Sequence, residues 1–105
     1  MVRCAFFGSD GNLTGFRITG HAGAGTKGTD IVCAAVSSAA YLVANTVTDV
    51  LHVPAQIQVE DGLLQLSLPQ EGQASCQPLL QGLALHLSAL SKDYPDHMAL
   101  TFSEK

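Results

Sequence analysis

The residues best suited to chemistry in this sequence are His21 and Cys33, which stand on either side of a glycine-rich run. A thiolate is a strong nucleophile, and a neighbouring histidine or a helix N-terminus favours it over the neutral thiol. An apolar periodic segment starts directly after Asp30, so Cys33 falls in the first turn of a predicted helix, where unpaired amides and the helix dipole stabilise an anion. The pair could therefore supply the nucleophile and the base of a thiol active site.

The run between them has little side chain to pack, and it consists of Ala22, Gly23, Ala24, Gly25, Thr26, Lys27, Gly28 and Thr29. Such a segment can lie over a substrate and open to release it, so we expect a lid. Asp30 either caps the helix, which is the commoner role, or orients the His21 ring. Ser37, one helical turn beyond Cys33, could donate a hydrogen bond to the thiolate or to a substrate, or bond back to its own helix. The alternative is that Cys33 is a core residue and His21 only ends a strand.

The glycines also satisfy two nucleotide-binding patterns in part. Gly23, Gly25 and Gly28 fit the dinucleotide pattern GxGxxG, with Asp49 further on as a ribose-binding acid. That pattern needs a strand-helix-strand unit, whereas two strands precede the helix here. The phosphate-binding P-loop fails because Lys27 stands one position late. A phosphate resting on the helix start stays open as an alternative.

The remaining histidines and cysteines indicate no further site. His52, His86 and His97 do not pair at metal-ligand spacing. Cys4 and Cys76 align with predicted core faces, so we expect them to be buried and inert. Three cysteines without a CxxC pair argue against disulfides and structural zinc. We therefore expect neither a metal nor a cofactor.

Length and composition predict one domain, residues 1–105, with a core of Leu, Val, Ile and Ala. The chain is 47% hydrophobic and 13% charged, as is typical of a globular protein. A net charge of -4 with five Lys and Arg offers no basic surface for direct nucleic-acid binding. The start has no signal-peptide core, and no apolar run approaches the roughly 18 residues of a membrane span, so we expect a cytoplasmic protein.

Hydrophobic periodicity predicts the elements that position these residues. Residues 2–7 and 13–19 alternate around a turn at Asp10-Gly11-Asn12, which predicts a hairpin that ends near His21. A helix from residue 31 to about 51 is predicted, capped by Thr29 or Asp30. Its predicted apolar stripe is Ile31, Val32, Ala35, Ala39, Leu42, Val43, Thr46, Val47 and Val50.

The second half repeats the order. Residues 55–60 and 63–68 form a predicted hairpin in which Ile57 and Val59 share a buried face with Leu64, Leu66 and Leu68. A second helix ends before Tyr94-Pro95, with a stripe of Leu79, Leu80, Leu83, Leu87 and Leu90, and residues 97–102 form a last strand. The order ββαββαβ predicts an α+β two-layer sandwich, a mostly antiparallel sheet with two helices on one face.

Two stretches carry a resemblance to a known family. Gly20-His21-Ala22 and Gly28-Thr29-Asp30-Ile31-Val32-Cys33-Ala34-Ala35-Val36-Ser37 resemble the signature of the bacterial ribosomal-processing cysteine protease Prp family. The resemblance implies a cytoplasmic, homodimeric endopeptidase that removes a short N-terminal extension from large-subunit ribosomal protein number twenty-seven. It also implies that Cys33 is the nucleophile, His21 its base, Asp30 and Ser37 further active-site residues, and 22–29 the substrate-gating loop.

A second hypothesis is that the chain is not an enzyme. The chain could be a noncatalytic ribosome-assembly or protein-binding module, in which the loop docks a partner and Cys33 belongs to the core.

In the protease, amides near Cys33 at the helix start are the expected donors to the oxyanion.

Overall fold

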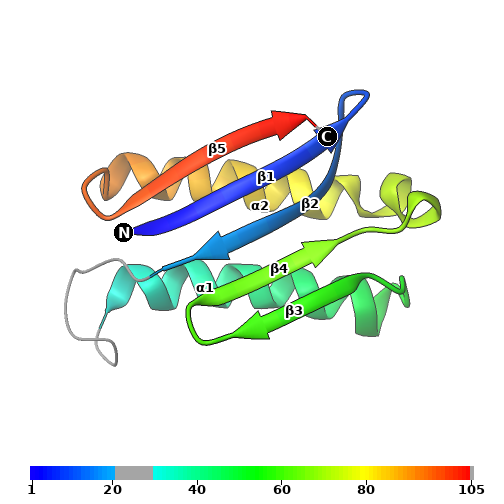
Figure 1. Ribbon diagram of the computed structural model, residues 1–105, viewed down its shortest axis with the longest axis horizontal. Coiled ribbons are helices and arrows are strands. Elements are labelled where there is room, and N and C mark those ends of the chain that lie inside the picture. The colour runs from blue at the N-terminus through cyan, green and yellow to red at the C-terminus, as the bar shows by residue number, and fades with distance from the viewer. Residues whose placement is uncertain (21–29, 105) are drawn as a thin grey trace.

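The computed structural model describes residues 1–20 and 30–104 and has the predicted order of elements. The strands are β1 (Val2–Ser9), β2 (Asn12–Thr19), β3 (Gln56–Glu60), β4 (Leu63–Ser67) and β5 (Met98–Glu104). The helices are α1 (Ile31–Asn45), continued by a π-helical turn (Thr46–Val50), and α2 (Gln73–Asp93), preceded by a 3-10 turn (Gln70–Gly72). Figure 1 shows the two helices side by side behind one face of the sheet. The predicted α+β two-layer sandwich is confirmed.

The sheet has the strand order β3-β4-β2-β1-β5. Three neighbouring pairs are antiparallel, and β1 and β5 are parallel. The parallel pair arises because α2 carries the chain across the sheet between β4 and β5, as a crossover helix does. The first hairpin turns at Asp10 and Gly11, whose φ angles of 54° and 82° both lie in the left-handed region that a two-residue type I′ turn requires.

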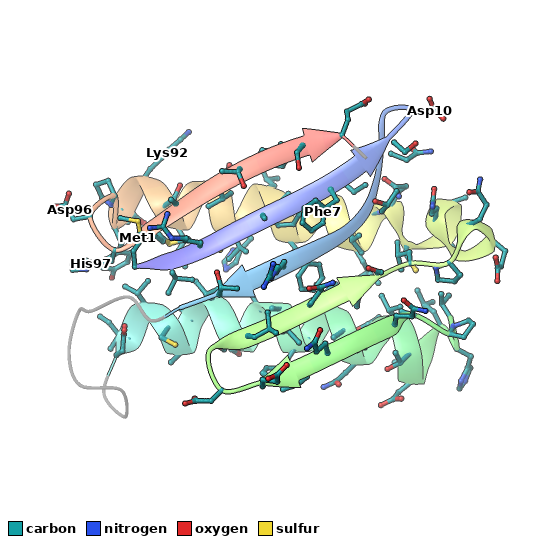
Figure 2. The ribbon with its side chains drawn as sticks, viewed as in Figure 1. Met1, Phe7, Asp10, Lys92, Asp96 and His97 are labelled. Carbon is teal, nitrogen blue, oxygen red and sulfur yellow. The ribbon has the colours of Figure 1, made fainter. Side chains whose placement is uncertain are left out.

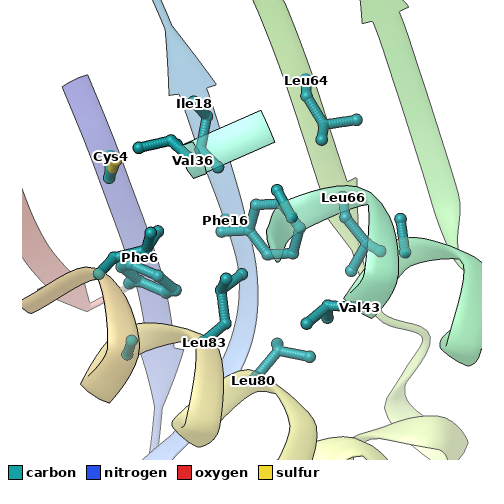
Figure 3. Packing of buried hydrophobic residues seen from close by; sticks show 14 of the residues in the cluster. Cys4, Phe6, Phe16, Ile18, Val36, Val43, Leu64, Leu66, Leu80 and Leu83 are labelled. Carbon is teal, nitrogen blue, oxygen red and sulfur yellow. The ribbon is translucent and has the colours of Figure 1, made fainter. Parts of the chain in front are cut away.

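The core lies between the sheet and the helices, where Phe6 and Phe16 from the sheet meet Leu80 and Leu83 from α2 (Figure 3). The residues of α1 that pack on the sheet differ in part from the predicted apolar stripe. Its buried residues are Val32, Val36, Ala40, Val43, Ala44 and Val47. Ile31 and Leu42 are 64% and 67% exposed. Alanine and valine occur all around this helix, so periodicity alone does not define which side packs on the sheet.

By length and composition alone, the helical run Ile31–Val50 could also cross a membrane, with a mean hydropathy of 1.6. In the structure one side of that run packs on the sheet, as a core helix does. The α2 prediction was closer to the structure, because Leu80, Leu83 and Leu87 are buried as expected. Leu79 and Leu90 are only partly covered.

Strand β3 differs from its prediction. Ile57 and Val59 pair with Leu66 and Leu64 across the hairpin, so they do lie on the helix-facing side of the sheet. They are nevertheless 39% and 52% exposed, whereas Leu64 and Leu66 are buried. The cause is position in the sheet: β3 is the end strand, and within residues 1–20 and 30–104 no other strand flanks its outer side.

Candidate active site

Asp30 fixes the start of α1. Its backbone is extended, with φ −73° and ψ 105°, and its Oδ1 accepts hydrogen bonds from the amides of Val32 and Cys33, each at 3.0 Å. Its backbone carbonyl accepts from Ala34 at 3.0 Å. The side chain is 4% exposed. Asp30 was predicted either to cap the helix or to orient His21, and the structure confirms that it caps the helix.

Cys33 lies in the first turn of α1, as predicted, with a partly buried side chain. It is not sealed in the core, in contrast to Cys4 and Cys76, which are 1% and 0% exposed. Burial raises the pKa of the Cys4 thiol to about 11, which further disfavours the reactive thiolate. Among the three cysteines, Cys33 alone is therefore placed to meet a reagent or a substrate.

A cavity of about 260 Å³ opens beside Cys33, between the first half of α1 and one end of the sheet. Ser37 and Tyr41 line the same wall of this cavity. Residues at a spacing of four share one side of a helix, so Cys33, Ser37 and Tyr41 form a row along α1. Ser37 therefore lies on the same side of α1 as Cys33, as predicted, while its hydrogen bond to the thiolate or the substrate stays a prediction. The cavity is large enough to accept a side chain next to the thiol.

The opposite wall comes from the turn between β3 and β4, through Glu60, Asp61 and Gly62. Gly20, the last described residue before His21, also lines the cavity. Its φ of +86° lies in the left-handed region, and its amide donates to the Gly62 carbonyl at 2.9 Å. A Cβ on residue 20 would lie 2.5 Å from the carbonyl oxygen of Met1. Figure 2 shows Met1 at the end of the sheet where β2 ends. Glycine is therefore required where the chain leaves β2 for the site.

His21 and the predicted loop from Ala22 to Thr29 lie outside the described residues. The structure places the two ends of that segment, Gly20 at the cavity and Asp30 at the helix start. The pairing of His21 with Cys33 and the gating role of the loop stay predictions.

The other candidates take no part in this cavity. His52 and His86 are exposed, and His97 lies at the start of β5 with its carbonyl accepting from the Val2 amide at 2.9 Å. Within the described ranges, no group of three or more His, Cys, Asp or Glu could hold a metal ion. Asp49, the supposed ribose-binding acid, lies in the π-helical turn at the far end of α1.

Sequence reasoning missed Tyr41 and the acidic pair Glu60 and Asp61. Tyr41 could have been found, because it continues the spacing of four that links Cys33 to Ser37. The acidic pair could not, because only the fold of the sheet brings the β3–β4 turn opposite α1.

Comparison with known proteins agrees with this geometry. Residues 1–99 match the family model described as cysteine protease Prp. A protein of Bacillus subtilis (strain 168) named ribosomal processing cysteine protease Prp is 29% identical over 98 residues, which cover 88% of each chain.

Two solved structures share the fold. The essential ribosomal processing protease Prp from S. aureus, in complex with a covalently linked product peptide, superimposes with a TM-score of 0.89. It is 24% identical, and the match covers 97% of this chain and 99% of that one. SMU.848 from Streptococcus mutans superimposes with a TM-score of 0.84 at 24% identity, covering 100% and 99%. With the family model matching nearly its whole length, this chain belongs to the cysteine protease Prp family and is a cysteine protease.

Proposed function

We propose that this protease removes a short N-terminal extension from large-subunit ribosomal protein number twenty-seven, with Cys33 as nucleophile and His21 as base. The observation that carries the proposal is the partly buried thiol of Cys33, in the first turn of α1 and beside the cavity. The relative from Bacillus subtilis, named for ribosomal processing, supports the substrate class.

In the proposed reaction, His21 takes the thiol proton and the Cys33 sulfur attacks the scissile carbonyl carbon. The tetrahedral intermediate collapses to a thioester as the C–N bond breaks and His21 gives its proton to the leaving amine. Water, deprotonated by His21, then attacks the thioester and releases the new carboxylate and the free thiol. The segment from Ala22 to Thr29 would close over the substrate during these steps.

The helix-start amides are less suited to the oxyanion than the sequence suggested. The amides of Val32 and Cys33 donate to Asp30 Oδ1, and the Ala34 amide donates to the Asp30 carbonyl. All three are thus already engaged. We propose that the Ser37 hydroxyl, which lines the cavity one turn from Cys33, donates to the oxyanion instead.

The test is cleavage of the extended ribosomal protein, followed by intact-protein mass. Cys33→Ala and His21→Ala should abolish cleavage, and Ser37→Ala should slow it by about 10²-fold if it loses an oxyanion donor. Ser38→Ala is the matched control, because Ser38 is exposed and does not line the cavity. Cleavage by Cys33→Ala at the parent rate would refute the mechanism.

Alkylation tests whether Cys33 is the nucleophile. Iodoacetamide should label Cys33 in the native protein much faster than Cys4 and Cys76, because the latter two are buried. Equal, slow labelling of all three would argue against Cys33 as the nucleophile. We further propose that the protein acts in the cytoplasm as a homodimer without binding nucleic acid or membrane. Sedimentation at micromolar concentration tests the dimer.

A further inference from the structure

Strand β3 offers an open edge directly next to the candidate active site. It pairs with β4 over its whole length, from Gln56 to Glu60, without a break in register. On its outer side, no strand pairs with it within the part of the chain that the structure describes. An edge of this kind presents backbone N–H and C=O groups to an extended peptide.

Natural edge strands usually carry a lysine, a proline or a bulge that hinders pairing with another chain. The segment Gln56–Glu60 has none of these. It presents instead two apolar side chains, Ile57 and Val59, which are 39% and 52% exposed on the helix-facing side. A strand added outside β3 would cover them, since neighbouring side chains on one face of a sheet pack against each other.

The same edge leads into the cavity that holds Cys33. Glu60 is the last residue of β3 and also lines the cavity, so the strand ends at its mouth. Along α1 the cavity follows Cys33, Ser37 and Tyr41, a distance of about 12 Å at the rise of an α-helix. Tyr41, 41% exposed, thus lines the cavity two helical turns from Cys33, together with Glu60 at the end of β3. In Figure 1, α1 runs behind the β3–β4 hairpin.

We propose that the substrate polypeptide binds as an added strand along the outer edge of β3 and enters the cavity at Glu60 to reach Cys33. This inference rests on the proposed protease function of that cavity. The geometry points to an extended, apolar segment on one side of the cleaved bond. Since the described charged residues of the cavity wall are Glu60 and Asp61, the segment next to the cleaved bond carries no acidic side chain.

Among the described strands, β5 forms the other edge of the sheet, and it does not suit this role. Strand β5 lies at the opposite end of the strand order from β3, and the exposed ring of Phe102 stacks on Phe6 with centroids 5.4 Å apart. A peptide on that edge would lie at the opposite side of the sheet from the β3–β4 turn, which lines the cavity.

The experiment compares two threonine variants of the edge strand, Ile57→Thr and Val59→Thr, with the matched control Val50→Thr. Threonine keeps the branched shape and the strand propensity, so the fold should be retained. Val50 is 66% exposed in the π-helical turn and faces no part of the cavity. The probe is a tryptic digest of a bacterial proteome, in which cleaved peptides are identified by mass spectrometry.

The parent should cut peptides that carry apolar residues at alternating positions on one side of the cleaved bond and lack Asp and Glu there. Each edge variant should cut those peptides about fivefold more slowly, while the control and the iodoacetamide labelling of Cys33 stay unchanged. An unchanged cleavage profile in both edge variants would overturn the proposal. So would loss of a dimer in these variants with cleavage unaffected, since the edge would then bind a second copy.

The outcomes also separate this inference from the ribosomal assignment. If the digest profile appears but the extended ribosomal protein is not cut, the edge-strand inference stands and the ribosomal substrate fails. If the ribosomal protein is cut equally by all variants, the ribosomal substrate stands and the edge-strand inference fails. If the parent cuts no peptide of the digest and no ribosomal protein, both fail.

Discussion

Replacing Asp30 separates its capping role from any role of its charge. In Asp30→Ala the amides of Val32 and Cys33 lose their acceptor in a place where the Asp30 side chain was only 4% exposed. Loss of a helix cap of this kind costs about 1.5 kcal/mol of unfolding free energy, and roughly 6–12 °C in melting temperature for a domain of this size. Asp30→Asn retains an oxygen acceptor, so it should cost only about 0.5 kcal/mol, mainly the lost attraction of the carboxylate to the helix dipole.

The assay is urea unfolding followed by far-UV circular dichroism, with cleavage of the extended ribosomal protein measured on the same samples. If Asp30→Asn destabilises the protein as much as Asp30→Ala, the capping argument is wrong and the charge is what matters. If Asp30→Asn is stable but cleaves much more slowly than the parent, the carboxylate also serves the reaction, as expected if it orients His21. If both stability and cleavage survive in Asp30→Asn, Asp30 is a cap alone.

Three further outcomes can be checked by unfolding experiments. Burial raises the pKa of the Cys4 thiol from 9.0 to about 11, so the unfolded chain loses this proton at a lower pH than the folded protein does. The free energy of unfolding should therefore fall as the pH rises from about 9 to 11, and it should fall less steeply in Cys4→Ala. Gly15→Ala should destabilise by about 2 kcal/mol or more, since its Cβ would overlap the Leu66 carbonyl oxygen in the neighbouring strand. Gly82→Ala, in α2 with nothing near the added atom, should stabilise by about 0.5–1 kcal/mol, and equal effects of the two substitutions would contradict both arguments.

Most of the architecture follows from local sequence patterns. The Asp10-Gly11 turn, the alternation around it and the leucine spacing of α2 each specify one element, and their order restricts the fold to a two-layer sandwich. The first turn of α1 is equally readable, because Asp30 is a strong capping residue just before an apolar run. The position of Cys33 in that turn therefore follows from the sequence alone, and the structure confirms it.

What the sequence leaves open depends on contacts between distant segments. The parallel pairing of β5 with β1 cannot be read from β5 alone, because the same alternation suits either direction. Ile57 and Val59 have a pattern typical of a buried face, and only the place of β3 at the end of the sheet leaves them exposed. The sequence does not show which side of α1 packs on the sheet, because alanine and valine occur on all sides of this helix.

The segment that carries His21 is tethered at both ends by bonds that do not depend on its own residues. Gly20 is held by the Gly62 carbonyl, and Asp30 is held by the amides of α1. Doubling the length of a loop between fixed anchors costs only about 0.6 kcal/mol in closure entropy. Insertions between Gly20 and Asp30 that leave His21 in place should therefore change the unfolding free energy of the domain by less than about 1 kcal/mol.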